Sequence, residues 1–207
     1  MNVAVLIYPN VELVDMNGPI NVFLHANEII GSTYYNIYTV AKDTTPLLSE
    51  GGVVTITPQY NLGNCPSPDI VVIPGIMDNG VPGIAGNAEI AWITEMVKGN
   101  KLILSVCIGT MSLAKTGLLS GRQATTHYLS IGDLHKQYPD IIIVKNVRYI
   151  QDGNIVTTGG VTSGIDGALY LVNKFNGEDV AQEAADIMVY NRDAPLPPYT
   201  ILPPYYS

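Results

Sequence analysis

KLILSVCIGT, residues 101–110, indicates the architecture of this chain more directly than any other segment. Residues 101–106 are almost continuously apolar, as in a strand that is buried on both faces of a parallel sheet. The run stops at Cys107, and residues 109–116 have the character of a helix. Such an abrupt change from strand to helix is typical of a nucleophile elbow, which presents a reactive side chain at the carboxyl end of a sheet.

The remaining apolar segments predict a sheet flanked by helices. Strands are expected at residues 3–8, 34–40, 53–57, 69–73, 101–106, 141–149 and 154–157. Helices are expected at residues 18–30, 87–98, 109–116, 129–137, 164–175 and 179–190. Alternation of this kind predicts an α/β sandwich around a mainly parallel sheet. Two glycine turns, Gly51-Gly52 and Asp152-Gly153-Asn154, predict hairpins at its margins.

Local signals define helix ends and domain limits. Asn17 occupies an N-cap position, and Ser163 and Asp166 have the spacing of a capping box, with Asp in place of Glu or Gln. We expect one domain over residues 1–193. The tail, residues 194–207, is too rich in proline for helix or strand.

Composition excludes several classes of protein. The chain has 207 residues, 47% of them hydrophobic, which is enough for a sizeable core. Its net charge of −8 argues against a nucleic-acid partner or an anionic membrane surface. No apolar run is long enough for a membrane span, and the N-terminus does not resemble a signal peptide. We therefore expect a cytoplasmic protein that binds a small molecule.

Cys107 is the candidate nucleophile. At the start of a helix, the partial positive charge and free N–H groups would favour its thiolate. Gly109 would allow a substrate or backbone to approach closely. The alternative is a buried, inert cysteine. Cys65 lies in a loop without a nearby base, and two cysteines indicate neither a disulfide framework nor a metal site, so no metal or cofactor is expected.

Asp15 is the candidate acidic partner. It follows the first strand, so it too is expected at a carboxyl end of the sheet. In a confined site its pKa would rise, and the protonated carboxyl could donate a hydrogen bond to sulfur or act as a general acid. The alternative is an aspartate that stabilises a turn. Glu12, nearby, is expected to face solvent.

Four further residues are candidates for binding the substrate. His127 could polarise the thiol or orient the substrate, or it could simply cap the next helix. The backbone N–H groups of Gly75 and Ile108 are candidates for an oxyanion hole, although Pro-Gly also occurs in many plain turns. Ile76, next to Gly75, is a second candidate for orienting the substrate.

Taken together, these residues resemble the ThiJ/PfpI superfamily, whose members have the class I glutamine-amidotransferase-like fold. The resemblance covers nearly the whole chain and rests on residues 14–19, 72–75, 105–109 and 121–127, with 157–166 extending it. The Asp-x-x-Gly-Pro and Ala-Thr-Thr-His elements are most similar to the branch that holds isonitrile hydratases and the sensor domains of AraC-type regulators.

The resemblance implies a flavodoxin-like three-layer α/β/α sandwich and a homodimer. It implies Cys107 as nucleophile, Asp15 as its acidic partner, and backbone donors at Gly75 and Ile108. Ile108 departs from the pattern, because PfpI-type peptidases carry His there and isonitrile hydratases carry Thr. The departure argues against a classical protease and removes a hydroxyl group found in the hydratases.

We therefore expect a cofactor-free cysteine enzyme, similar to isonitrile hydratases or to related amidase-type hydrolases. Alternatives are a glyoxalase- or deglycase-like activity on dicarbonyls, and a non-catalytic redox-sensing or ligand-binding domain. A transcription factor is disfavoured, because the sequence ends at Ser207 without a DNA-binding module and is acidic.

Overall fold

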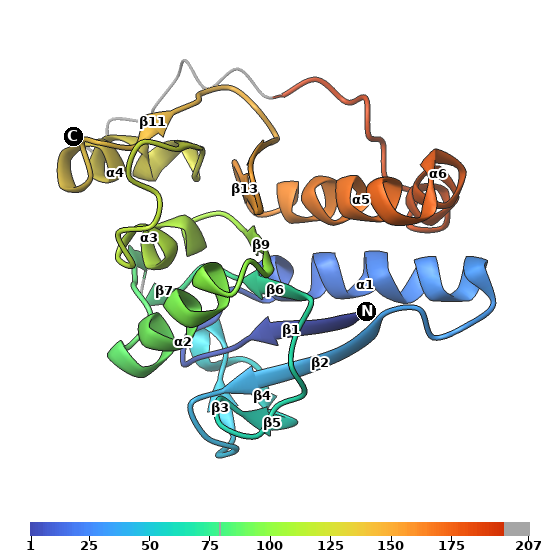
Figure 1. The fold of residues 1–207 in the computed structure, drawn as a ribbon, viewed down its shortest axis with the longest axis horizontal. Helices are drawn as coiled ribbons and strands as arrows, with labels where there is room; N and C mark the ends of the chain where they lie inside the picture. The colour runs from blue at the N-terminus through green and yellow to red at the C-terminus, as the bar shows by residue number, and fades with distance from the viewer. Residues whose placement is uncertain (79, 197–207) are drawn as a thin grey trace.

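A computed structural model describes residues 1–78 and 80–196 of the chain, and its centre is a seven-stranded sheet (Figure 1). The strands follow the order β12 (Tyr149–Asp152), β13 (Ile155–Thr158), β9 (Leu102–Ser105), β6 (Ile70–Ile73), β1 (Asn2–Leu6), β2 (Asn36–Ala41) and β5 (Tyr60–Asn61). All neighbours are parallel except β12 and β13. The mainly parallel sheet confirms the prediction.

Helices cover both faces of this sheet, which confirms the α/β/α sandwich. On one side lie α1 (Leu13–Ile30), α5 (Ser163–Asn176) and α6 (Glu178–Ile187), packed against one another (Figure 1). On the other side lie α2 (Asn87–Lys98) and α3 (Gly109–Ala114), which pack against β9. A shorter helix, α4 (Ile131–Gln137), follows a 3₁₀ turn at Tyr128–Ser130.

Three small two-stranded sheets decorate the sandwich. β3 (Leu47–Leu48) pairs with β4 (Thr55–Ile56), β7 (Met77–Asp78) pairs with β8 (Val81–Pro82), and β10 (Gln123–Ala124) pairs with β11 (Ile142–Ile143). The first of these contains a 3₁₀ turn at Glu50–Gly52. The hairpins predicted at Gly51-Gly52 and at Asp152-Gly153-Asn154 are confirmed by the β3–β4 and β12–β13 pairs.

One predicted strand and one predicted helix start are wrong. Residues 141–149 form no continuous strand, because Asn146 has a left-handed φ of 58° that separates β11 from β12. Helix α1 begins at Leu13, so Asn17 lies inside it. Its N-cap is Glu12, whose Oε2 accepts the Asp15 N–H at 2.6 Å. The helix therefore starts one turn earlier than the predicted cap.

The strand order places the chemistry-bearing loops together. The sheet grows outward in both directions from β1, with β6 on one side and β2 on the other. The registers Val5↔Val72 and Ile73↔Ser105 bring the carboxyl ends of β1, β6 and β9 to one edge of the sheet. In open α/β folds this edge, at the point where the strand order reverses, is where ligands bind.

The predicted proline-rich tail lies mostly outside the described residues, which end at Leu196. Within residues 1–78 and 80–196, no helix combines the length and apolar character needed to cross a membrane.

Candidate active site

The predicted elbow forms at the end of β9. β9 ends at Ser105, α3 begins at Gly109, and Cys107 between them has a φ of 55°. This left-handed conformation is uncommon outside glycine and is characteristic of strained positions at functional sites. A Cβ atom at Gly109 would lie only 2.1 Å from the carbonyl oxygen of Ile73 at the end of β6. Glycine therefore lets the elbow pack directly on the neighbouring strand.

Hydrogen bonds made by the Ala-Thr-Thr-His element hold the elbow in place. The Thr126 hydroxyl donates to the carbonyl oxygen of Cys107 at 3.0 Å. The Thr110 hydroxyl in α3 donates to the Thr125 carbonyl at 3.0 Å, and the Thr125 N–H donates to Thr157 Oγ1 in β13 at 2.8 Å. All four threonines are buried. Since buried polar groups that are hydrogen-bonded rigidify their surroundings, the network fixes the backbone conformation of Cys107.

Asp15 is a buried carboxyl group in the first turn of α1. Its Oδ2 accepts the Gly75 N–H at 2.8 Å, whereas its Oδ1 is buried without a hydrogen-bond partner among the described residues. Burial, and then the neighbouring Glu12 carboxylate, raise the pKa of Asp15 well above its ordinary value. The carboxyl group therefore retains its proton more readily than an ordinary aspartic acid, and Oδ1 is the free position for that proton.

The Gly75 N–H binds Asp15 and is therefore not free to act as an oxyanion donor. Its N–H is bonded to Asp15, and its carbonyl oxygen accepts the Glu12 N–H at 3.0 Å. A Cβ atom at Gly75 would lie 2.6 Å from Ile108 Cγ1 and 2.7 Å from Asp15 Oδ2. The expected oxyanion role of Gly75 is thus displaced in this structure, because the amide already anchors the acid. The backbone N–H of Ile108 remains beside the Cys107 sulfur.

The sulfur environment differs from the expectation of a stabilised thiolate. Burial raises the pKa of the Cys107 thiol well above its ordinary value, and Asp15 adds to this effect when it is ionised. The Ile108 N–H opposes it but does not reverse it. Helix α3 has only six residues, Gly109–Ala114, so its dipole is short. The thiol at neutral pH is therefore neutral, next to a carboxyl group that retains its proton more readily than an ordinary aspartic acid.

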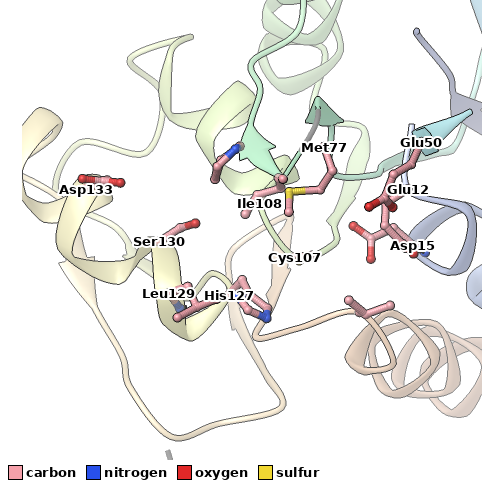
Figure 2. A pocket seen from close by; sticks show the side chains of 13 residues that line it. Glu12, Asp15, Glu50, Met77, Cys107, Ile108, His127, Leu129, Ser130 and Asp133 are labelled. Carbon is pink, nitrogen blue, oxygen red and sulfur yellow. Dashed lines mark hydrogen bonds between the residues drawn. The ribbon is translucent and has the colours of Figure 1, made fainter. Parts of the chain in front are cut away.

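A cavity of about 350 Å³ opens at Cys107. This volume is suitable for a small molecule. Figure 2 shows Asp15 with Glu12 and Glu50 on one side of Cys107, and Asp133 with Ser130 on the opposite side. The described residues that line the cavity are Glu12, Asp15, Glu50, Met77, Gly80, Pro82, Cys107, Ile108, His127, Leu129, Ser130, Asp133 and Val161.

Of the two residues expected to orient a substrate, the structure places only His127 at the cavity. Its Nδ1 accepts the Leu129 N–H at 3.4 Å, so the proton of the neutral ring is on Nε2. Burial lowers the pKa of His127, which favours this neutral form. Ile76 is buried, bridges to Val11 and is not among the described residues that line the cavity. Its side chain occupies the space beside Gly83 instead.

Several lining residues escaped the sequence analysis. Glu12 was expected to face solvent, but it caps α1 and lines the cavity. Glu50 arrives from the β3–β4 hairpin, and burial raises its pKa, with a further contribution from Glu12. Leu129 and Ser130 come from the 3₁₀ turn before α4, and Asp133 comes from the first turn of α4. No local motif marks these positions, since the tertiary arrangement of separate segments brings each of them to the cavity.

Two other expectations concern groups away from Cys107. Cys65 is half-buried and does not line the cavity among the described residues. Within residues 1–78 and 80–196, no group of three or more His, Cys, Asp or Glu side chains could hold a metal ion.

Comparisons with known proteins agree with this geometry. A model of the DJ-1/PfpI family matches residues 1–174. Isonitrile hydratase from Pseudomonas putida is 31% identical over 201 residues, which cover 96% of this chain and 81% of that protein. The transcriptional regulator GbdR of Pseudomonas aeruginosa is 22% identical, and the match covers 92% of this chain and 51% of the regulator.

Solved structures show the same fold. A ThiJ/PfpI family protein from Pseudomonas syringae superposes with a TM-score of 0.76 at 28% identity, covering 96% of this chain and 77% of that one.

Proposed function

Because the chain belongs to the DJ-1/PfpI family, we propose that it is a cysteine-dependent hydratase that converts an isonitrile into an N-substituted formamide. One observation carries the proposal. The strained Cys107 and the buried, proton-retaining Asp15 line the same small cavity. The similarity to isonitrile hydratase supports this choice of substrate over other electrophiles.

The first step adds the thiol across the isonitrile carbon. The Cys107 sulfur forms a bond to the terminal carbon of R–N≡C, while the Asp15 carboxyl group delivers its proton to the same carbon. The thiol proton replaces the one that Asp15 gives up. The product is a thioimidate, R–N=CH–S–Cys107, and no oxidant or reductant is consumed. A neutral thiol beside an acid with a raised pKa suits this step, because the two groups together can supply the protons that it moves.

The second step releases the formamide. A water molecule attacks the thioimidate carbon, and Asp15 donates a proton to the nitrogen. The tetrahedral intermediate then expels the Cys107 sulfur, which recovers a proton, and R–NH–CHO leaves. The Ile108 N–H stabilises negative charge on sulfur during both steps. The neutral His127 lines the cavity and presents its Nε2 proton as a hydrogen-bond donor.

The test combines product analysis with trapping of the intermediate. The purified protein is incubated with cyclohexyl isonitrile in ¹⁸O-labelled water, and the formamide is measured by mass spectrometry. We expect one ¹⁸O per formamide and, at short times, a Cys107 peptide heavier by the mass of the isonitrile. Cys107→Ala should remove both signals, whereas the matched variant Cys65→Ser should retain them. Absence of formamide from a series of alkyl and aryl isonitriles would refute the proposal.

A ligand-binding domain is the second candidate. The similarity to a regulator and the raised pKa of the Cys107 thiol favour it. It predicts saturable binding of an isonitrile or a dicarbonyl that persists in Cys107→Ser, without any product. Calorimetric titration of this variant therefore separates the two candidates. Redox sensing is less favoured, because a buried thiol with a raised pKa reacts slowly with peroxide.

A further inference from the structure

The cavity at Cys107 is acidic. Four carboxyl groups line it, from Glu12, Asp15, Glu50 and Asp133. Among the described lining residues none is a lysine or an arginine, and burial keeps His127 in its neutral form. Low-dielectric walls that carry charges of one sign focus the electrostatic potential inside a cleft. An anionic ligand would lose its water among like charges here, whereas a cationic ligand would gain from them.

The four carboxyl groups divide into two sets with an apolar surface between them. Glu12 and Glu50 lie beside Asp15 at the reacting end, and Asp133 lies on the other side of Cys107 (Figure 2). Met77, Ile108 and Leu129 supply apolar surface for the body of a ligand. At the reacting end the buried Asp15 Oδ1 has no hydrogen-bond partner among the described residues, which marks this end as the place for the group that is protonated.

Asp133 is available for recognition. The Glu12 carboxylate already accepts the Asp15 N–H, but no hydrogen bond or ion pair is found for Asp133 within the described residues. It is exposed in the first turn of α4, beside the cavity that it lines. A cation that pairs with Asp133 would therefore keep part of its hydration while the apolar body of the ligand is buried.

We infer that the cavity selects a bifunctional small molecule that carries an electrophilic carbon at one end and an ammonium group at the other, with Asp133 pairing the ammonium. The identity of the electrophile as an isonitrile rests on the proposed function. The charge preference rests on the carboxylates of Glu12, Glu50 and Asp133 and does not need a charge on Asp15. The two ideas can therefore fail separately, and the experiment has one arm for each.

The first arm measures the charge preference with thiol reagents. The 2-aminoethyl and 2-sulfonatoethyl methanethiosulfonates share one leaving group and one ethyl spacer, and their end groups carry opposite charges. Attack by the Cys107 sulfur forms a disulfide and expels methanesulfinate from either. The ratio of the two rates at Cys107 is divided by the same ratio for 2-mercaptoethanol. The quotient measures the charge preference that the cavity adds to the intrinsic reactivity of the reagents. We expect a preference for the cation of at least about 10-fold at low salt, which decreases as salt is added.

Matched variants show which carboxyl groups cause the charge preference. Asp133→Asn should lower the ratio several-fold. The double variant with Asp133→Asn and Glu50→Gln should lower it further. Glu183→Gln removes the same charge from the exposed face of α6, away from the cavity, and should leave the ratio unchanged. A ratio equal to that of 2-mercaptoethanol would overturn the inference. So would equal effects of Asp133→Asn and Glu183→Gln, and so would a Cys107 that neither reagent reaches.

The second arm uses two isonitriles with the same alkyl chain, one ending in a trimethylammonium group and the other in a sulfonate. We expect the cationic isonitrile to have the higher kcat/KM, mainly through a lower KM. Turnover of both at equal kcat/KM would contradict the charge preference and leave the hydratase intact. Charge-selective modification of Cys107 without turnover of either would contradict the hydratase and leave the charge preference intact.

Discussion

Asp15 and Asp166 occupy equivalent places in two adjacent helices, yet the partners of the two carboxyl groups have opposite effects on their ionisation. Each lies in the first turn of its helix, α1 or α5, and each is buried. Asp166 accepts hydrogen bonds from Arg148 at 2.9 Å and from Tyr190 at 2.8 Å. Asp15 accepts a single amide and leaves one oxygen unpartnered among the described residues. A buried carboxyl group that pairs with a cation stabilises the fold as a carboxylate. A buried carboxyl group without a cation retains its proton more readily and can act as a general acid.

The charges of the two sites follow from these partners. Burial raises the pKa of Asp166, but Tyr190 and Arg148 both favour its ionised form. Burial also raises the pKa of Asp15, and there Glu12 adds to the effect instead of opposing it. The Asp166 site connects α5 to the loop before β12 and to the segment after α6. The Asp15 site faces the cavity.

The largest expected effect is the loss of turnover in Asp15→Asn. Asn retains the shape and can accept the Gly75 N–H, but it cannot donate a carboxyl proton. If Asp15 is the general acid, kcat should fall by about 10²-fold or more. The measurement is formamide production, with circular dichroism to verify folding. Full turnover in this variant would exclude the acid role and remove the contrast with Asp166.

Asp166→Asn should instead affect stability. It leaves the partly buried Arg148 guanidinium without its counter-ion, so unfolding should become easier by about 2 kcal/mol, less than for a fully buried pair. Urea denaturation measures this change. Turnover per folded molecule should stay close to that of the parent protein, because Asp166 does not line the Cys107 cavity among the described residues. A 10²-fold loss of kcat with unchanged stability would reverse the assignment.

Gly75→Ala tests the anchor of Asp15. The new Cβ atom would overlap Ile108 Cγ1 at 2.6 Å and Asp15 Oδ2 at 2.7 Å, so the acid must move. We expect a destabilisation of about 1–3 kcal/mol and a kcat reduced at least about tenfold. Gly132→Ala, in α4, is the matched control, because a Cβ atom there meets nothing within 4 Å. Similar urea midpoints for the two variants would show that the Gly75 contact is not tight.

The smallest effect is a pH-dependent gain of stability in Asp15→Asn. A carboxyl group whose pKa is raised by folding holds its proton in the folded state, so its stability contribution is full at low pH and is lost as pH rises through the folded pKa. Removing it should stabilise the protein at pH 8 and have much less effect at pH 4. Thermal unfolding at the two pH values checks this sign. Equal changes at both would contradict the raised pKa.

Prediction from sequence succeeded where the signal was local. The apolar run 101–106 followed by Cys107 and Gly109 predicted a strand, a sharp turn and a helix, because burial on both faces and close packing restrict these residue types. Prediction was less successful where side-chain contacts had to be inferred from residue spacing. The spacing of Ser163 and Asp166 predicted a capping box, but α5 has no side-chain cap, and Asp166 pairs with Arg148.

The candidate site divides along the same line. Cys107, Asp15 and His127 were identified from sequence, and the structure brings them to one cavity. Ile76 was placed there wrongly, because its position next to Gly75 does not tell which way its side chain points. Gly75 was expected to bind an oxyanion, since the spacing could not show that its N–H meets Asp15.

The order of amino acids was enough to predict the sheet-and-helix alternation, the elbow, and the nucleophile and acid candidates. These features depend on backbone sterics and on the burial of neighbouring residues, which the order of residue types encodes. Two features emerged only from the folded chain: Glu12, Glu50 and Asp133 line the cavity, and burial keeps Cys107 a neutral thiol. Charge proximity and desolvation are long-range quantities. They depend on how β1, β6 and β9 align, and on where separate loops meet above them.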